Sequence, residues 1–320
     1  MISRSRRHLL IAAAAAGPLA PLVAIAKPAT PKLINLSYVR SPFNLQSMVM
    51  VENSLLEKEF AADGIAVKWH TIDSGAVQSQ AIAAGSIDIA GVMNTTSLLL
   101  ANAGGNPLRI ATGVSRPART FALVGAQGGP KTFAELRGKK VAGPRGTVLH
   151  QLLVAGLARA GLSIKDVEFH SMDPGKSAAA LAAGQVDAAL IVAGLTIKAL
   201  AQGAHLIASA DGLVNPLLAM VVRQDFAARQ PELLARVVRV HRATSAWIAA
   251  NPDAAIAIGA RVQGVSLADA RQLAQWSGYT DSFNAADVAS IKADQAFLIA
   301  NGMMKAPIKV DELFLAGSRI

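Results

Sequence analysis

Short runs of alternating apolar and polar residues, each followed by an alanine-rich stretch, recur between residues 32 and 222. Alternation with a period of two predicts a strand with one buried face, whereas apolar residues three and four apart predict a helix. On this basis we expect strands at residues 33–39 and 139–142 and a helix at residues 148–160. Strands and helices that alternate along a chain favour an α/β fold with mostly parallel sheets and helices on both faces.

One strand-turn-helix-strand unit occurs twice in the sequence. The segment VKWHTIDSG at residues 67–75 is matched by VEFHSMDPG at residues 167–175, and AIAAGSIDIA at residues 81–90 is matched by ALAAGQVDAA at residues 180–189. In each copy an alternating strand ends at Asp-x-Gly, and the helix that follows ends at a glycine before the next strand begins. A repeat of this kind predicts two lobes of similar architecture with a ligand cleft between them.

Beyond residue 222 the pattern changes to consecutive helices, which we expect at residues 231–251 and 266–277. These helices are expected to pack back onto the first lobe. The predicted layout is a first lobe at residues 27–118 and 222–320 and a second lobe at residues 119–221. The chain would then cross between the lobes twice, and the two crossings would form a hinge.

Residues 1–26 predict an export signal. Arg6 and Arg7 precede an apolar stretch, and Ala24-Ile25-Ala26 supplies the small-x-small pattern that a signal peptidase recognises. We therefore expect a signal peptide that is cleaved after Ala26. The alternative, a membrane anchor, is disfavoured because a glycine and two prolines interrupt the stretch and alanine is only weakly apolar.

The paired arginines resemble a twin-arginine signal, which exports proteins that have already folded. Leu9 stands where such signals usually have phenylalanine, so export by the ordinary Sec route stays open. No other apolar run reaches membrane-spanning length, and we expect a periplasmic protein with no stable membrane insertion.

The composition argues against several classes of protein. The chain has 320 residues, of which 52% are apolar, and this is ample for a hydrophobic core in each lobe. Its net charge is +10, but the basic residues are scattered and aromatic residues make up only 4%, which disfavours nucleic-acid binding. The lack of cysteine excludes disulfides, thiolate metal sites and cysteine nucleophiles.

Four turns lead from a predicted strand into a predicted helix, at residues 73–75, 91–96, 143–147 and 173–175. In open parallel sheets ligands bind beyond the carboxyl ends of the strands, where helix N-termini present unpaired N–H groups and a partial positive charge. We expect these turns to converge from both lobes on one cleft that holds an anion. The candidate ligand-binding residues are Arg40, Ser41, Asn44, Ser74, Gly75, Asn94, Thr95, Arg145, Gly146, Thr147, His150 and Asp173.

Each type of candidate also has a structural interpretation. Arginines near strand ends could pair with an anionic head group or remain solvated surface charges. The short polar residues stand at helix starts, where capping needs them with or without a ligand. His150 is either a ligand contact or an ordinary helix residue, and the order of residues around Gly146 and Thr147 does not match a nucleotide-binding P-loop. The arginines near strand ends are Arg40, Arg116, Arg119 and Arg145.

We assign no residue to catalysis, to a metal or to a cofactor. His70 and His170 occupy equivalent positions of the repeat in different lobes, which indicates a shared structural role and argues against a metal pair. Asp88 and Asp187 follow the helix-ending glycines at strand starts, on the edge opposite the cleft. We expect these two carboxylates to stabilise turns or the hinge, and they are not a catalytic pair.

Several segments, in their order and spacing, resemble the sulfonate, taurine and nitrate group of periplasmic solute-binding proteins, including its thiamine-pyrimidine-precursor relatives. They lie at residues 33–39, 73–75, 83–88, 136–142, 182–188, 223–226 and 246–255. The resemblance covers nearly all of the mature chain and implies a type II periplasmic-binding fold with two connecting strands. Where many members carry an aromatic or acidic residue, this chain has IVAGL at residues 191–195. Such an apolar wall disfavours taurine and nitrate and leaves room for a bulkier organic tail.

The predicted function is that of the substrate-binding component of an ABC importer. We expect a monomer that captures a small anionic organic solute, sulfonate-like or a carboxylate, by lobe closure and delivers it to permease subunits. An enzyme on the same fold, of pyrimidine-precursor or dehydratase type, is one alternative, although the pyrimidine-forming relatives rely on cysteine-rich iron sites. A sensory role, in which the loaded clamp docks on a receptor, is another.

Overall fold

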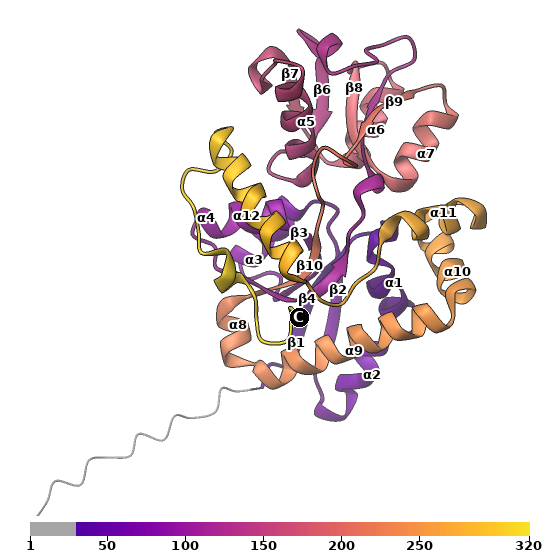
Figure 1. Cartoon of the computed structure of the whole chain (residues 1–320). Helices are drawn as coiled ribbons and strands as arrows, with labels where there is room; N and C mark the ends of the chain where they lie inside the picture. The colour runs from indigo at the N-terminus through magenta and orange to yellow at the C-terminus, as the bar shows by residue number, and fades with distance from the viewer. Residues whose placement is uncertain (1–29) are drawn as a thin grey trace, which may run out of the picture.

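The computed structural model describes residues 30–320 (Figure 1). The predicted signal peptide, its twin-arginine pattern and the cleavage after Ala26 lie outside the described residues. Within residues 30–320 no helix is both long and apolar enough to cross a membrane.

Two five-stranded sheets, one in each lobe, form the body of the molecule (Figure 1). The first has the order β2-β1-β3-β10-β4 and consists of β1 (Leu33–Tyr38), β2 (Ala66–Thr71), β3 (Ile89–Asn94), β4 (Leu108–Ser115) and β10 (Leu218–Arg223). The second has the order β7-β6-β8-β5-β9 and consists of β5 (Phe121–Gly125), β6 (Lys140–Gly143), β7 (Glu168–Ser171), β8 (Ala188–Val192) and β9 (His205–Ser209). The predicted two-lobed α/β architecture is confirmed.

The two sheets follow one plan. β1 pairs in parallel with β2 and β3, and β6 pairs in parallel with β7 and β8. By contrast, β10 and β5 run antiparallel to both of their neighbours. Each sheet is therefore mixed, with four strands in one direction and one strand against them. In both lobes the reversed strand is the one that enters from the other lobe.

Helices flank both sheets. The first lobe contains α1 (Leu45–Glu52), α2 (Leu55–Phe60), α3 (Gly75–Ala83) and α4 (Thr95–Ala103), and the second contains α5 (Val148–Arg159), α6 (Pro174–Ala182) and α7 (Ala193–Ala201). The C-terminal part contributes α8 (Gln224–Arg229), α9 (Pro231–Ala250), α10 (Pro252–Gln263), α11 (Leu267–Ser277) and α12 (Ala285–Ala300). The helices expected at residues 148–160, 231–251 and 266–277 are confirmed as α5, α9 and α11. Side chains of Asn94 and Asp173 accept hydrogen bonds from the first turns of α4 and α6, which fixes where these helices begin.

Asp88 and Asp187 tie equivalent strands together at the ends away from the helix N-termini. The Asp88 carboxylate accepts a hydrogen bond of 3.0 Å from the backbone N–H of Asn35, and the Asp187 carboxylate accepts one of 2.8 Å from Lys140. Asp88, directly before β3, is thereby joined to β1, and Asp187, directly before β8, is joined to β6 in the same way. The two groups lie in separate sheets and do not form a pair.

The chain crosses between the lobes at residues 116–120 and again at residues 210–217. The boundary expected between residues 221 and 222 falls inside β10, which pairs with β3 and β4 in the first sheet. β10 is almost entirely buried, and because a strand covered on both faces carries no polar pattern, its sequence does not assign it to one lobe.

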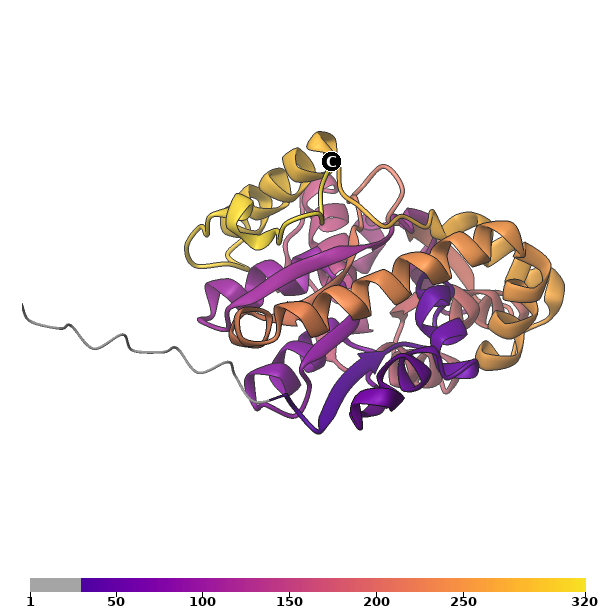
Figure 2. The same cartoon turned by 90° about the horizontal axis from the view of Figure 1, so that it is seen from below.

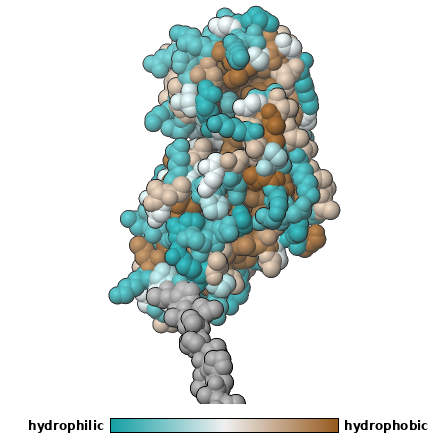
Figure 3. Space-filling model, turned by 90° about the vertical axis from the view of Figure 1, so that its left-hand side faces the viewer, coloured by the Kyte–Doolittle hydropathy of each residue, from teal (hydrophilic) through white to brown (hydrophobic). Residues whose placement is uncertain are grey.

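The C-terminal helices α9, α10 and α12 pack against helices of the first lobe. α9 runs along α1 and α2, as Figure 2 shows. Arg236 of α9 donates a hydrogen bond of 2.7 Å to the Glu59 carboxylate of α2 and lies over the Phe60 ring at 4.5 Å. α10 and α11 extend beyond this body, so that α11 contacts α7 of the second lobe. On the face that carries α4 and α12 the surface is mainly hydrophilic, with apolar residues in separate patches (Figure 3).

The two lobes also contact each other directly beside the crossings. Ser97 Oγ of α4 donates a hydrogen bond of 3.0 Å to the backbone oxygen of Gly146 in the second lobe. Gln151 of α5 lies between two partners in the first lobe: its Oε1 accepts a hydrogen bond of 2.5 Å from Thr96 Oγ1, and its Nε2 donates one of 2.6 Å to Asp294 of α12. These contacts hold the lobes in the arrangement that encloses the cavity described next.

Candidate ligand-binding site

A cavity of about 620 Å³ lies between the lobes and is lined by both of them. The first lobe contributes the end of β1 and the loop after it, the start of α3 and the end of β3. The second lobe contributes the start of β5 and the N-terminal turns of α5, α6 and α7. The turn between α10 and α11 closes one side.

The strand ends explain why the cavity forms at this place. Parallel strands present their carboxyl ends at one edge of a sheet, and the helices that follow begin there with unpaired N–H groups. The two Asp-x-Gly turns of the repeat both reach the cavity, through residues 73–75 from the first lobe and through Pro174 and Gly175 from the second. The expected convergence of the repeated turns on one cleft is what the structure shows.

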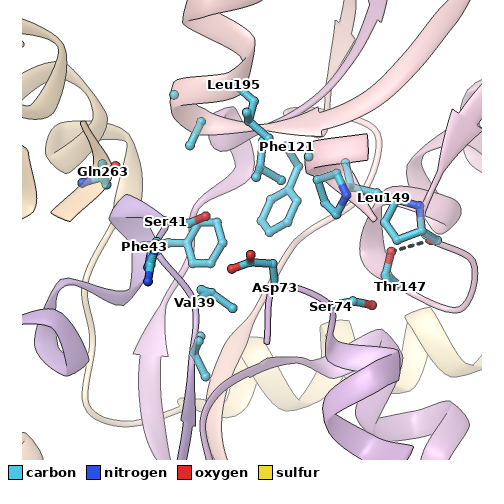
Figure 4. A pocket seen from close by; sticks show the side chains of 18 of the residues that line it. Val39, Ser41, Phe43, Asp73, Ser74, Phe121, Thr147, Leu149, Leu195 and Gln263 are labelled. Atoms are coloured by element: carbon cyan, nitrogen blue, oxygen red, sulfur yellow. Dashed lines mark hydrogen bonds between the residues drawn. The ribbon is translucent and has the colours of Figure 1, made fainter. Parts of the chain in front are cut away.

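Half of the predicted site residues line the cavity: Arg40, Ser41, Ser74, Gly75, Asn94 and Thr147. Ser74 precedes α3 but makes no side-chain capping bond, so its hydroxyl is available to a ligand. Thr147 Oγ1 donates to the backbone oxygen of Pro144 at 2.9 Å, which fixes the turn before α5 (Figure 4). A side chain at Gly75 would bring its Cβ to 2.8 Å from Asn94 Nδ2 and from Ser97 Oγ, so a larger residue here would displace these two side chains.

Three predicted residues serve the structure behind the cavity wall. Asn44 is buried and donates a hydrogen bond of 3.2 Å to the backbone oxygen of Val39. Thr95 is buried at the start of α4, and Asp173 caps α6 by accepting a hydrogen bond of 2.9 Å from the backbone N–H of Lys176. None of these three side chains is among the lining residues of the cavity.

The remaining three predicted residues, Arg145, Gly146 and His150, form a cluster around Phe169 at the back of the second-lobe turn. The Arg145 guanidinium lies 4.8 Å from the centre of the Phe169 ring, and the His150 ring stacks on the same ring at 5.0 Å. His150 Nδ1 accepts a hydrogen bond of 3.4 Å from the backbone N–H of Gly146. Burial and the charge of Arg145 lower the pKa of His150 to about 4, so its imidazole is neutral at neutral pH.

The other two arginines considered as anion partners lie elsewhere. Arg116 forms an ion pair of 2.6 Å with Asp287 at the start of α12, and this contact raises the pKa of Arg116. Arg119 lies 3.4 Å from Asp211 on the surface. Arg40 is therefore the predicted arginine that the structure brings to the cavity.

Sequence reasoning missed several lining residues. The rings of Phe43 and Phe121 stack at 5.3 Å across the junction of the lobes, and Figure 4 shows the Asp73 carboxylate directed toward them. Gln78 of α3 and Lys198 of α7 also line the cavity. For Asp73 the repeat contained a usable signal. Asp173 has a lysine three residues later, at position 176, whereas Asp73 has alanine at the equivalent position 76 and therefore lacks that cationic neighbour.

The wall that the sequence predicted to be apolar is present. Val192, Ala193, Gly194 and Leu195 line the cavity between β8 and α7. Ala193 has φ +48°, a conformation that residues other than glycine rarely adopt, and it turns the chain sharply from strand into helix. The wall offers apolar contact and the N-terminus of α7 in the same place.

Sequence comparison decides the family. The model of the family described as NMT1/THI5 like matches residues 59–255. A protein of Brucella abortus (strain 2308) with the printed name "Putative binding protein" is 31% identical over 223 residues, which cover 68% of this chain and 67% of that protein. The chain belongs to the NMT1/THI5-like family.

Other comparisons place this NMT1/THI5-like chain among known binding proteins and folds. The taurine-binding periplasmic protein of Escherichia coli (strain K12) is 27% identical over 203 residues, covering 59% of this chain and 60% of that protein. The alkanesulfonate-binding protein SsuA of Xanthomonas axonopodis pv. citri, bound to MOPS, has a TM-score of 0.78 at 22% identity and covers 91% of this chain and 100% of that one. The predicted type II periplasmic-binding fold is thereby confirmed. The desulfurization enzyme DSZB shares the fold with a TM-score of 0.63 at 16% identity, covering 90% of this chain and 97% of that one.

In this member of the NMT1/THI5-like family the lining of the cavity is suited to holding a ligand. Its hydroxyl groups have no histidine among the described lining residues to activate them as nucleophiles. Within residues 30–320 no group of histidine and acidic side chains is arranged to hold a metal ion. What the lining provides is hydrogen-bonding groups at helix N-termini, charged side chains of both signs, and apolar surface.

Proposed function

We propose that this protein is the solute-binding component of an ABC importer and that it captures a small organic acid, a sulfonate or a carboxylate, between its lobes. The observation that carries the proposal is a cavity lined by helix N-terminal turns from both lobes. A ligand held from both sides favours the closed arrangement by its differential affinity, which is how a two-lobed binding protein signals that it is loaded.

The chemistry of the lining supports an organic acid. The N-terminal turns of α3 and α5 and the side chain of Arg40 can donate to an acidic group. Phe43, Leu149 and Leu195 offer apolar surface to a carbon chain. Relatives named for binding taurine and aliphatic sulfonates support the same class of ligand.

The location and partners belong to the same proposal. We propose that the chain is exported to the periplasm, that the signal is removed after Ala26, and that the loaded monomer delivers its ligand to permease subunits. The periplasmic Escherichia coli relative and the signal-like residues 1–26 support this location. A chain without cysteine supports binding over the cysteine-dependent enzyme chemistry considered above.

The test is a binding screen on the mature protein. Thermal-shift measurements over linear alkanesulfonates, carboxylates, nitrate and pyrimidines are expected to single out organic acids, with dissociation constants of about 1 μM, equivalent to about 8 kcal/mol. Mass spectrometry of the recovered compound is expected to show it unchanged.

Thr147→Tyr, which places an aromatic ring in the cavity between the helix N-terminal turns, should abolish binding, whereas the exposed Val77→Tyr on α3 should not. Stabilisation by no organic acid, or chemical conversion of a bound one, would refute the proposal.

A further inference from the structure

The first-lobe side of the cavity carries a carboxylate where a simple anion site would have none. Asp73 is exposed to the cavity and, within residues 30–320, has no hydrogen-bond or ion-pair partner. Its counterpart in the repeat, Asp173, caps α6 and lies 3.3 Å from the Lys176 ammonium. α3 instead has Ser74 at the capping position, so the Asp73 carboxylate lies one residue before the cap and points toward the Phe43 and Phe121 rings (Figure 4).

A second, buried acceptor lies one helical turn further along α3. Gln78 is 1% exposed and lines the cavity. Its Nε2 donates a hydrogen bond of 2.8 Å to the backbone oxygen of Ile72. A backbone oxygen can only accept, so this bond fixes the orientation of the amide and leaves Oε1 as the free end. Oε1 is buried and has no partner among the described residues, a situation that costs about 1–3 kcal/mol unless a donor is supplied.

The charges of the cavity are mixed in sign. Arg40 and Lys198 line it without ion-pair partners among residues 30–320, and Asp73 and Asp269 line it with the opposite charge. A plain anion would satisfy the two cations but would repel Asp73, and lobe closure would remove water from that carboxylate without pairing it. A ligand with a positive group and a negative group satisfies both signs.

We infer that the cavity selects a zwitterionic organic acid, whose acidic group meets the helix N-termini and the cationic side chains and whose ammonium group meets Asp73 and, after a shift of the buried Gln78 side chain, Gln78 Oε1. The inference rests on the proposed function, because it takes this cavity as the ligand site. The aromatic rings of Phe43 and Phe121 beside Asp73 add a face that attracts cations. Asp73 and Gln78 are thus assigned as residues that determine specificity.

The test compares matched pairs of compounds that differ only in an amino group. The pairs are 3-aminopropanesulfonate with propanesulfonate and 5-aminopentanoate with pentanoate, measured by calorimetry against the wild type, Asp73→Asn, Gln78→Met and Asp173→Asn. In the wild type the amino member of a pair should bind about 10-fold to 100-fold more tightly, the effect of one or two charge-assisted hydrogen bonds. Asp73→Asn should remove most of this preference, and Gln78→Met part of it. Asp173→Asn, which changes the equivalent residue outside the cavity, should retain it.

The outcomes separate this inference from the proposed function. Equal affinity for both members of each pair in the wild type, or equal losses for both members in Asp73→Asn, overturns the inference and leaves an importer component for plain acids. Binding of no organic acid overturns both. Asp73 is exposed, so Asp73→Asn should fold normally, and Asp73→Ser serves as a second variant if its thermal unfolding differs from that of the wild type.

Discussion

His150 is buried in α5, where its ring stacks on Phe169 and its pKa is lowered to about 4. An unfolded histidine titrates near 6.5, so the stability that neutral His150 contributes is fully present above that pH and is lost as the pH falls toward 4. Between about pH 7.5 and about pH 5 the loss should be about 1–2 kcal/mol. We predict that the free energy of unfolding of His150→Gln falls less between these two pH values than that of the wild type, by about 1–2 kcal/mol, as measured by urea unfolding. His241, whose pKa is also lowered to about 4, is present in both proteins and cancels. Identical pH profiles would contradict the assignment.

Asp294 is expected to change stability with pH in the opposite direction to His150, because it destabilises the fold at neutral pH and not at acidic pH. Burial raises its pKa to about 6, against the accepted hydrogen bond from Gln151 that lowers it. The stability associated with its protonated form is present below 3.8 and is lost as the pH rises through about 6. Asp294→Asn keeps an oxygen for Gln151 without the charge, and it should therefore raise stability by about 1–3 kcal/mol near pH 7.5 with little gain near pH 4. Thermal unfolding at the two pH values measures this, and a variant that is less stable near pH 7.5 would show that the carboxylate is needed in its charged form.

At the residue scale the sequence predicted the regions of the site better than its side chains. Ser74 and Thr147 stand at strand-to-helix turns and reach the cavity, but His150 stands one helical turn further and faces Phe169 instead. The direction of a side chain depends on which face of its helix packs against the sheet, and this requires the tertiary structure. Phe43 and Phe121 are apolar residues of a kind that is usual in any hydrophobic core. The sequence alone therefore does not indicate that their side chains lie beside Asp73.

α5 illustrates how packing limits an element. It is buried along most of its length, and its Gly156 faces the ring of Phe133, where an added Cβ would lie 2.0 Å from Cζ. Alanine favours a helix over glycine by about 1 kcal/mol, but a collision of this size costs about 1–3 kcal/mol or more. We predict that Gly156→Ala lowers the midpoint of urea unfolding, and that the double variant Gly156→Ala with Phe133→Leu recovers part of the loss. A single variant more stable than the wild type would show that Phe133 moves aside freely.

The elements of the repeat could be predicted, because each of them has a local cause. α6 begins at the Asp173 cap, and Gly184 adopts φ +66° just beyond its end, both of which are visible in the sequence. β10 could not be placed, because an apolar strand buried on both faces would suit either sheet. Its partner strands are set by the crossing at residues 210–217, and no local pattern records that path.

At the scale of the whole molecule, Gln151 links both lobes through Thr96 and Asp294. Loss of two such hydrogen bonds should cost about 1 kcal/mol each in the closed arrangement and shift the ligand-free protein toward an open one. We predict that Gln151→Ala increases the radius of gyration of the ligand-free protein in small-angle scattering and weakens ligand binding by about 10-fold, while saturating ligand restores the compact value. The exposed Gln185→Ala is the control. Unchanged scattering would show that the crossings alone hold the lobes together.

The position of β10 between β3 and β4 has a consequence for how the chain is made. All five strands of the second sheet lie within residues 121–209, so a ribosome finishes that lobe as one uninterrupted stretch. The first sheet cannot be completed before β10, which ends at Arg223, has been synthesised. Until that point β3 and β4 lack the strand that lies between them. Unpaired strand edges invite association with other chains. During synthesis the lobe that begins the protein is therefore the last to be completed and the one most exposed to aggregation.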